Sequence, residues 1–340
     1  MASRTTNDVV RDALIRRGMR PDRATDTVEA LPLASIADLL PGHAQSGLCR
    51  ALADAPPPDQ RGADWMTARG TVRLDGPVIV GILNVTPDSF SDGGTYMDPA
   101  AALDHAAVMI AEGADMLDVG GQSTRPGGAR SVPVDEEWRR LAPVLRELAR
   151  QHPECPVSVD TVKSEIAERA LDAGVWAIND VSGLRFDARV ADVCARHNAG
   201  LILMHSRGRF SEISSYDHTC YTDVVANVAH ELALAVGLAQ ERGVGREALV
   251  LDPGFGFAKL PEQNYSLLGG LPTLKRGGFP VMVGPSRKRF LRVLVQHATL
   301  GADRVTAAVC LIALLLGANL FRVHAVRVVG EVLAFGRVES

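Results

Sequence analysis

From residue 78 onward, short aliphatic runs alternate with longer stretches in which apolar residues recur every three or four positions. The short runs are typical of buried strands, and the longer stretches are typical of helices with one buried face. This alternation predicts the βαβα order of a parallel sheet. The predicted strands cover residues 78–83, 116–119, 157–159, 176–178, 201–204, 249–251, 281–283 and 321–323. Eight such units predict an α/β fold closed into a (β/α)8 TIM barrel.

Three of the intervening stretches carry clear helix signals. The first begins at Pro99 after Asp98, a pair typical of a helix N-terminus. Its predicted buried stripe consists of Leu103, Ala106, Ala107 and Ile110. The other two stripes are Ile166, Ala170 and Leu171, and Val224, Val228, Leu232 and Val236.

Residues 1–64 do not follow this pattern. Apolar groups at residues 9–14 and 36–40 predict two or three short helices, and the prolines at 56–58 are typical of a linker. The alternation from Trp65 to Leu74 predicts a hairpin that closes the barrel bottom. A chain of 340 residues can hold two domains, although barrels of about 250 residues are single domains. We predict a small helical N-terminal extension and linker in residues 1–64 and one barrel in residues 65–340.

Composition and charge exclude several classes of protein. With 46% hydrophobic and 22% charged residues, the chain has an ordinary globular composition, and its net charge of -4 argues against a nucleic-acid partner. The five cysteines lack C-x-x-C spacing, so neither a disulfide framework nor a zinc site is predicted. Residues 1–20 lack the apolar core of a secretory signal. The uncharged apolar run at residues 305–321 is too short to span a membrane. We expect a cytoplasmic protein in which residues 305–321 form a buried helix and strand.

Polar and glycine-rich clusters directly follow the predicted strands, at what would be the C-terminal rim of the barrel. Singly, an Asp or Asn after a strand is usually a turn former or a helix cap. Eight clusters that converge on one opening favour an active site instead. In strand order they contain Asn84, Asp88 and Ser89; residues 120–125; Asp160; Asn179 and Asp180; His205; Asp252; Ser286, Arg287 and Lys288; and Arg322 and His324.

These side chains suit an anionic heterocyclic substrate. A buried Asp160 or Asp252 can accept two parallel N–H bonds from the flat aminopyrimidinone edge of a pterin. Asn84 can complete the shell of a magnesium ion held by phosphates. The cations that can bind a diphosphate, with backbone amides at residues 93–94 and 120–121, are Arg125, Lys288, Arg322 and His324. P-loop, dinucleotide-binding, H-E-x-x-H and G-x-S-x-G motifs do not occur in the sequence, which argues against nucleotide hydrolysis, hydride transfer and serine hydrolysis.

The motifs around these residues carry a resemblance to a known family. ILNVTPDSFSDGG (82–94) and DVGGQSTRPG (118–127) resemble the first two signatures of the dihydropteroate synthases, which are pterin-binding TIM-barrel enzymes. Six more motifs follow in the family's order: SVDT (158–161), INDVSG (178–183), LMHSRG (203–208), LDPGFGFAK (251–259), GPSRKRF (284–290) and RVH (322–324). The match covers roughly residues 66–338.

The resemblance implies a role for each matching residue. Those implied to hold the pterin are Asp160, Asn179, Asp252 and Lys288, with Met204, Gly284 and Phe257 near its ring. Those implied to bind the diphosphate and Mg2+ are Asn84, Arg322 and His324. Two mobile loops are implied to close over p-aminobenzoate, next to Phe257 and Lys288; they carry Asp88 and Phe90, and Ser123, Thr124, Arg125 and Pro126. Catalysis is expected to rest on Asp160, Lys288, Arg125 and Asp88.

The implied reaction is dissociative. Pyrophosphate leaves first, Asp160 stabilises the pterin methylene cation, and the arylamine attacks it, without a covalent enzyme intermediate. A carboxylate near the cation, and cations with magnesium near the leaving group, favour this charge separation. The resemblance also implies a homodimer built through barrel helices, for which the apolar stretch at residues 305–316 gives independent support.

The sequence departs from the family pattern at three positions. Gln122 stands where the family often has Glu, and one acceptor oxygen is kept. Ala325 replaces the Asp that commonly follows the RVH histidine, which removes a partner of a rim group and weakens diphosphate or magnesium binding. Arg292 replaces a common Gly.

Two other functions agree with parts of the sequence. A pterin-dependent methyltransferase would share the pterin-binding Asp and Asn residues, but it would not need Lys288, Arg322 or the motif at 82–94. Lack of any response to p-aminobenzoate would be the first support for a methyltransferase. A catalytically silent pterin-binding barrel with a regulatory or scaffold role agrees with Ala325 and the extension, but not with an intact set of substrate residues.

Overall fold

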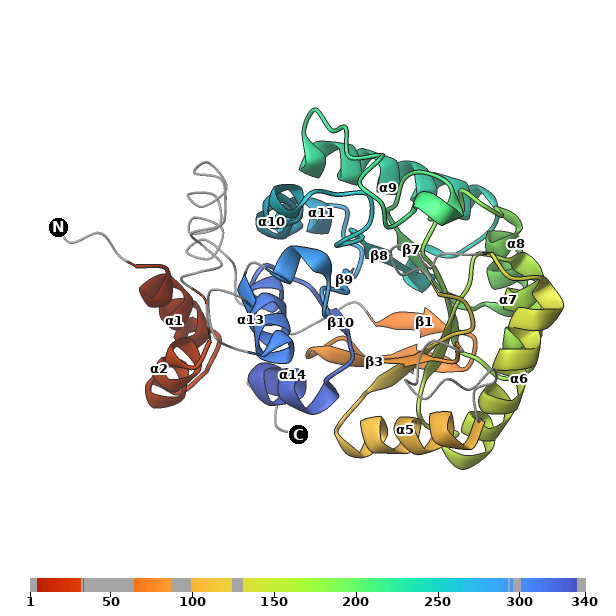
Figure 1. Ribbon diagram of the computed structural model, residues 1–340, viewed down its shortest axis with the longest axis horizontal. Helices are drawn as coiled ribbons and strands as arrows, with labels where there is room; N and C mark the ends of the chain where they lie inside the picture. The colour runs from red at the N-terminus through yellow and green to blue at the C-terminus, as the bar shows by residue number, and fades with distance from the viewer. Residues whose placement is uncertain are drawn as a thin grey trace.

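The computed structural model describes residues 5–31, 33, 64–86, 99–123, 131–292, 294–295 and 301–334. Its main element is a parallel sheet of eight strands in the order β8-β7-β6-β5-β4-β3-β10-β9 (Figure 1). A bridge between Leu251 and Val281 joins β8 to the segment that leads into β9 and closes the barrel. The strands are β3 (Val78–Asn84), β4 (Met116–Gly120), β5 (Val157–Asp160), β6 (Ala177–Asp180), β7 (Gly200–Met204), β8 (Leu249–Asp252), β9 (Met282–Val283) and β10 (Leu320–Val323). The predicted fold is confirmed, and every strand lies within two residues of its predicted bounds.

Helices surround this barrel on its outer side (Figure 1). They are α5 (Pro99–Ala111), α6 (Val134–Gln151), α7 (Ser164–Asp172), α8 (Arg189–His197), α9 (Val224–Glu241), α10 (Pro261–Gly269), α11 (Leu271–Lys275), α13 (Ala302–Leu315) and α14 (Val326–Leu333). The stripes predicted for α7 and α9 are buried as expected.

The stripe predicted for α5 is wrong in part. The buried residues of this helix are Ala102, Ala106 and Met109, whereas Ala107 is exposed. Gly81 of β3 explains the shift, because a side chain there would meet the sulfur of Met109 at 3.0 Å. The space above that glycine accommodates the Met109 side chain. Helical periodicity cannot identify this contact with the sheet.

The predicted hairpin closes the barrel bottom. Strands β1 (Trp65–Thr67) and β2 (Gly70–Val72) pair in antiparallel orientation. The Trp65 ring is fully buried, packs in a cluster with the first residues of several barrel strands, and donates its ring N–H to the Ala248 carbonyl at 2.8 Å. A Cβ on Gly200 would lie 2.6 Å from this ring, so the glycine is required for the plug to fit.

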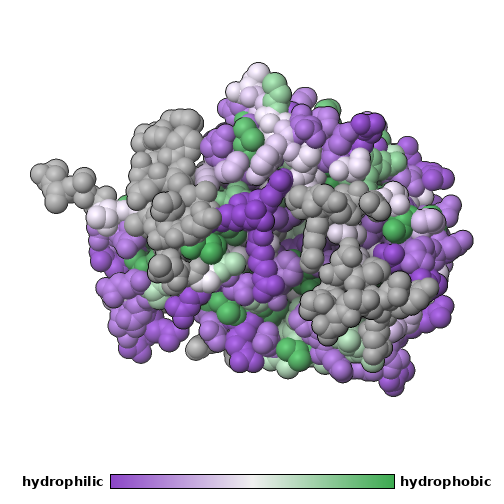
Figure 2. All heavy atoms as spheres, viewed as in Figure 1, coloured by the Kyte–Doolittle hydropathy of each residue, from purple (hydrophilic) through white to green (hydrophobic). Residues whose placement is uncertain are grey.

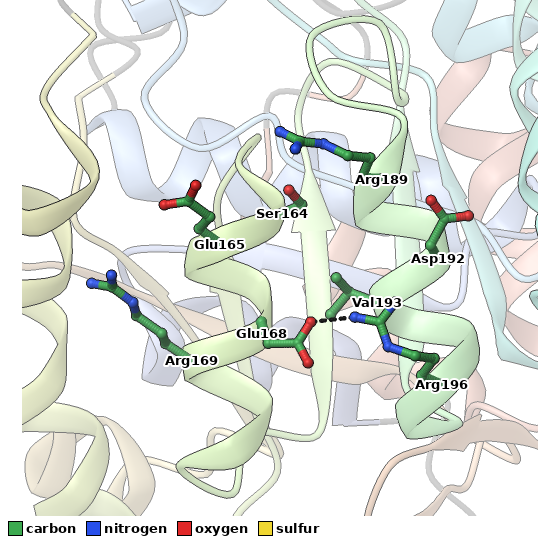
Figure 3. A pocket seen from close by; sticks show the side chains of 8 residues that line it. All are labelled: Ser164, Glu165, Glu168, Arg169, Arg189, Asp192, Val193 and Arg196. Atoms are coloured by element: carbon green, nitrogen blue, oxygen red, sulfur yellow. Dashed lines mark hydrogen bonds and ion pairs between the residues drawn. The ribbon is translucent and has the colours of Figure 1, made fainter.

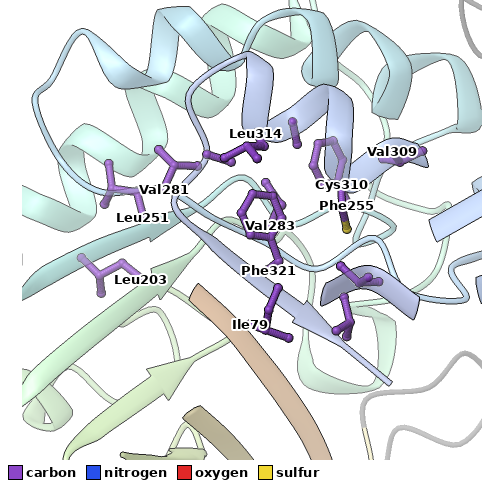
Figure 4. Packing of buried hydrophobic residues seen from close by; sticks show 14 of the residues in the cluster. Ile79, Leu203, Leu251, Phe255, Val281, Val283, Val309, Cys310, Leu314 and Phe321 are labelled. Atoms are coloured by element: carbon purple, nitrogen blue, oxygen red, sulfur yellow. The ribbon is translucent and has the colours of Figure 1, made fainter. Parts of the chain in front are cut away.

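The apolar run at residues 305–321 forms helix α13 and strand β10, as predicted. Every residue of α13 from Val305 to Leu315 is buried. Figure 4 shows Val309, Cys310 and Leu314 of this helix packed near Phe321 and neighbouring strands. Burying a side chain of this size contributes about 1.5–3 kcal/mol, so this layer is a major part of the core.

The N-terminal extension covers the outer side of α13. Helices α1 (Thr6–Arg16) and α2 (Pro21–Glu29) lie against each other, and α1 contacts α13 (Figure 1). Val10 and Leu14 of α1 are fully buried in the same cluster as α13. The apolar character of residues 305–316 is therefore accounted for within the chain and no longer supports a homodimer. Residues 34–63 lie outside the described part, so the helix predicted at 36–40, the linker and the domain boundary at residue 64 stay predictions.

Arg17 ties the extension to the end of α13. Its guanidinium donates to the carbonyls of Leu314 at 3.2 Å and Leu315 at 2.7 Å. Burial lowers the pKa of Arg17 to about 10, so it stays charged at neutral pH. Because charged hydrogen bonds contribute about 1.5–3 kcal/mol, we expect Arg17→Met to lower the free energy of unfolding by about that amount. Urea unfolding tests this, with the exposed Arg23→Met as the control, and equal losses in both variants would contradict it.

The face seen in Figure 2 is mostly hydrophilic, with small, separate hydrophobic areas between the polar side chains. Each helix in the described ranges is too short or too polar to cross a membrane.

Candidate active site

The C-terminal ends of the barrel strands bring the predicted polar residues into one row. Asn84 pairs in register with Gly120, which pairs with Asp160. Asp160 pairs in turn with Asn179 on β6, and Asp252 ends β8 further round the barrel. These residues, which are far apart in sequence, share one rim as the positional argument predicted.

Arg322 on β10 joins two carboxylates at this rim. Its Nε donates to Asp118 Oδ2 at 2.6 Å and its Nη2 donates to Asp160 Oδ2 at 3.1 Å. The side chain of Asp118 is 1% exposed and that of Arg322 is 17% exposed. When both carboxylates are ionised, the three side chains carry a net negative charge, which favours a cation placed beside Asp160.

Asn179 presents an open acceptor. Its Nδ2 donates to Asp118 Oδ2 at 3.0 Å, whereas its buried Oδ1 has no hydrogen-bond partner among the described residues. A buried acceptor without a partner costs about 1–3 kcal/mol, so such an atom is expected where a ligand supplies the donor.

Burial perturbs the titratable groups of the rim. It raises the pKa of Asp160 to about 7, against the opposing effect of Arg322, and it raises the pKa of Asp252 to about 6. Desolvation, with the charge of Arg322, lowers the pKa of Lys288 to about 7. Carboxylates and an amine that titrate near neutrality are typical of a catalytic site.

Lys288 and an apolar cluster form the second side of the site. The Lys288 ammonium lies 3.7 Å from the centre of the Phe257 ring, a cation–π contact. Phe257 belongs to a buried cluster with Met204. Gly284 lies beside Arg322, because a Cβ there would meet the Arg322 Cβ at 3.8 Å. Flat apolar walls beside charged groups suit a planar heterocycle.

His324 and Asn84 occupy further positions on the rim. His324 Nδ1 lies 2.9 Å from the Ser286 hydroxyl, which accepts from the His324 backbone N–H at 3.2 Å. A Cβ on Gly120 would lie 3.6 Å from Asn84 Oδ1 and 3.9 Å from Asp160 Oδ2. Gly120 therefore leaves open space between these two oxygens.

The two predicted substrate loops lie almost wholly outside the described residues. Ser123 is described and half-buried, directly after the turn that follows β4. The others, Asp88, Phe90, Thr124, Arg125 and Pro126, are not among the described residues, so their roles stay predictions.

Two residues important to the site were not predicted from the sequence. Asp118, inside β4, was quoted only as part of a motif, although it accepts from Arg322, Asn179 and the Ser158 hydroxyl. An Asp within a strand of otherwise buried residues was the available signal. Glu137, on α6, is 1% exposed and also raises the pKa of Asp160. Its ion pair with Lys163 links residues from two separate helical units, which no local pattern reveals.

The departures from the family pattern have local explanations. The acceptor oxygen kept by Gln122 receives a hydrogen bond from Lys163 at 2.8 Å, whereas its buried Nε2 has no hydrogen-bond partner among the described residues. Arg292 is exposed and has helical φ of −59°, so its position does not need glycine. Ala325 is the N-cap of α14 and provides no side-chain hydrogen bond to the first turn.

Ala325→Asp is expected to stabilise the protein by about 1 kcal/mol, because an N-cap carboxylate accepts from the free N–H groups of α14. Thermal unfolding measures this, and Ala325→Asn is the matched control because it caps without a charge. An unchanged melting temperature in both variants would contradict the capping argument. Tighter pyrophosphate binding in the Asp variant alone would support the predicted role of this position at the rim.

A pocket of about 360 Å³ lies elsewhere, between α7 and α8 (Figure 3). It is lined by three arginines that could attract anions, but each is already paired with a carboxylate. The pairs are Arg169 with Asp135, Arg189 with Asp187, and Arg196 with Glu168. The chemistry of the rim has no counterpart there, so we place the candidate active site at the rim.

Known proteins resemble this chain along most of the barrel. The family described as pterin binding enzyme matches residues 80–324. A dihydropteroate synthase from Synechocystis is 43% identical over 256 residues, which cover 75% of this chain and 87% of that protein.

Solved structures agree with this likeness. The dihydropteroate synthase from Xanthomonas albilineans with 4-aminobenzoic acid is 40% identical, with a TM-score of 0.72. The same enzyme in complex with 7,8-dihydropteroate is 38% identical, with a TM-score of 0.69. Both likenesses cover 80% of this chain and 96% of the other.

Proposed function

This chain belongs to the pterin-binding enzymes and, among them, to the dihydropteroate synthases, and we propose how its rim residues divide the reaction. The activity is the condensation of p-aminobenzoate with 6-hydroxymethyl-7,8-dihydropterin diphosphate to 7,8-dihydropteroate and pyrophosphate. The observation that carries the assignment of roles is the open Asn179 Oδ1, on β6, which lies with β7 between the strands of Asp160 and Asp252. An acceptor between two carboxylates matches the N–H donors of a pterin edge.

The pterin is bound by carboxylate and amide oxygens at its edge and by apolar side chains at its faces. Asp252 and Asn179 accept from the ring N–H groups, as both are nearly fully buried. Met204 and Phe257 supply the apolar wall, and the Lys288 ammonium lies over the same ring that the heterocycle would approach. Burial makes each of these hydrogen bonds selective, because a substrate without the matching group leaves a polar atom unpaired.

The diphosphate is bound on the other side of Asp160. Arg322 and His324 supply N–H donors there, with Gly284 allowing close approach to Arg322. Asn84 at the end of β3 offers a neutral side-chain oxygen, so a magnesium ion would take its oxygens from Asn84 and the substrate. When bound, it neutralises charge on the leaving group.

The chemistry is a stepwise displacement. The C–O bond to the diphosphate breaks and its electron pair leaves with pyrophosphate, which gives a methylene cation on the pterin. The Asp160 carboxylate stabilises this cation, helped by the net negative charge of the group it forms with Asp118 and Arg322. The amine then forms the new C–N bond and loses a proton. Arg125 and Asp88 assist from the two loops in this proposal, which also assigns p-aminobenzoate contacts to Phe90, Thr124 and Pro126.

Pyrophosphate release by the purified protein tests the function. With the pterin diphosphate and magnesium, we expect p-aminobenzoate to give stoichiometric pyrophosphate and dihydropteroate. Asp252→Asn should weaken pterin binding, whereas the surface variant Asp135→Asn should not. Pterin binding without product in the presence of the amine would contradict catalysis by this chain.

The homodimer also remains a proposal. Sedimentation of the full chain measures its mass in solution and decides between a monomer and a dimer.

A further inference from the structure

A buried lysine lies beneath the rim and has no role in the proposed chemistry. Lys259 is 1% exposed, and its ammonium lies 3.0 Å from each of three acceptors. These are the carbonyls of Gly254 and Phe257 and the Nδ1 of His205. Burying an ammonium costs several kcal/mol, and here the three acceptors satisfy its donors while burial lowers the pKa of Lys259 to about 7. They do not by themselves explain its use.

The turn held by this ammonium has a backbone that needs support. Gly254 and Gly256 have φ of +70° and +76°, and Ala258 has φ of +45°, which is unfavourable for a residue with a Cβ. A Cβ on Gly254 would lie 1.9 Å from the His205 carbonyl oxygen, so the turn packs directly on the end of β7. Strained backbone of this kind persists only where surrounding contacts hold it. Lys259 bonds to carbonyls on both sides of Gly256.

The same turn carries two parts of the pterin site. Asp252 stands at its start, and Asp252 Oδ1 accepts from the Gly254 N–H at 2.7 Å. Phe257 lies within it, with its ring under the Lys288 ammonium. A displacement of Gly254 therefore moves the N–H group that donates to the Asp252 carboxylate, and a displacement of Phe257 moves the apolar wall of the pterin site.

A second path connects Lys259 back to the turn through α9. His205 Nε2 lies 3.0 Å from Glu231 Oε2, and Glu231 also pairs with Arg207. Arg207 lies 3.9 Å over the Tyr221 ring, whose hydroxyl donates to the Ala258 carbonyl at 3.1 Å. Burial lowers the pKa of His205 to about 4, so at neutral pH Nε2–H donates to Glu231 and Nδ1 accepts from Lys259.

We propose that Lys259 is a positioning residue of the pterin site, whose ammonium fixes the turn at residues 252–258 and thereby places the Asp252 carboxylate and the Phe257 ring. The proposal rests on the proposed function, because it assumes that these two groups contact the pterin. Lys259 itself does not touch substrate.

Binding of 6-hydroxymethylpterin to the full chain, measured by calorimetry at 20 °C, tests this role. Lys259→Met keeps the length of the side chain and removes the donors, and we expect its dissociation constant to rise at least ten-fold. Lys275→Met is the matched control, because Lys275 is a half-buried lysine whose ammonium donates to the Phe279 carbonyl and Asn319 Oδ1 away from the rim. It should lose thermal stability but bind the pterin within about two-fold of the unchanged protein.

The outcomes separate this role from a purely structural one. A folded Lys259→Met variant with unchanged pterin affinity overturns the proposal. If that variant does not fold, Lys259→Gln decides, since its shorter amide keeps two N–H donors but cannot bond all three acceptors: a loss of at least about three-fold supports the proposal and unchanged affinity overturns it. Failure of the proposed pterin site looks different, because the unchanged protein would then not bind the pterin, or Asp252→Asn would bind it equally well, and failure of catalysis would show as pterin binding without product.

Discussion

Arg322→Met is expected to lower the free energy of unfolding by about 3–5 kcal/mol and the kcat/KM for the pterin diphosphate by at least about 100-fold. The variant removes the guanidinium that pairs with Asp118 and Asp160, so two buried carboxylates lose their counter-charge. Methionine replaces the apolar stem of the side chain but not its guanidinium, so the loss is mainly one of charge and hydrogen bonds. Urea unfolding and steady-state kinetics measure the two effects.

The stability loss should depend on pH in a definite direction. The pKa of Asp160 is already raised to about 7, and loss of Arg322 removes an effect that lowers it. A carboxyl whose pKa is higher in the folded than in the unfolded state contributes stability below its unfolded pKa and loses it as pH rises through the folded pKa. The deficit of Arg322→Met should therefore be larger at pH 8 than at pH 5.

The matched control is Arg242→Met, which removes a partly exposed ion pair with Asp192. Such surface pairs contribute about 1 kcal/mol or less. A loss in Arg322→Met as small as that of the control, at both pH values, would mean that the buried carboxylates do not depend on this guanidinium.

Much of the fold could be predicted because strands and helices leave local patterns. The run 78–83 is aliphatic throughout and became β3, buried on both faces. The packing of α1 on α13 could not be predicted, because Arg17 reaches carbonyls nearly 300 residues away in sequence, at 314 and 315. The shifted stripe of α5 has the same cause, since it depends on the space over Gly81.

The residues of the site show the same division between those that local sequence predicts and those that it does not. Asp160, Asn179 and Asp252 could be predicted because each lies at the last or the penultimate position of a strand, and parallel strands end at one rim. Asp118 lies two residues before the end of β4, so position alone did not single it out. Lys259 follows a glycine-rich turn, and only the folded chain shows that its ammonium bonds back to that turn. Rim residues are set by local sequence, whereas the groups that hold them in place are set by tertiary contacts.

Lys288→Ala is expected to lower kcat/KM roughly 30- to 1,000-fold, which corresponds to a loss of about 2–4 kcal/mol of transition-state stabilisation. The ammonium lies over the Phe257 ring and near the carboxylates of Asp160 and Asp252, which raise its pKa against the larger effect of desolvation. Lys288→Arg keeps the charge and should retain more activity than Lys288→Ala, while Lys275→Met, away from the rim, should retain nearly all of it. Unchanged turnover in Lys288→Ala would contradict the role.

The pH profile distinguishes loss of the Lys288 charge from loss of shape. Catalysis needs Asp160 ionised and Lys288 protonated, and both groups have a pKa of about 7 in the free protein. The kcat/KM of the unchanged protein should therefore be bell-shaped, with its maximum near neutral pH. In Lys288→Arg the alkaline limb should move above pH 9, because a guanidinium stays protonated there, whereas the acid limb set by Asp160 should remain. An alkaline limb that stays in place would assign that titration to a group other than Lys288.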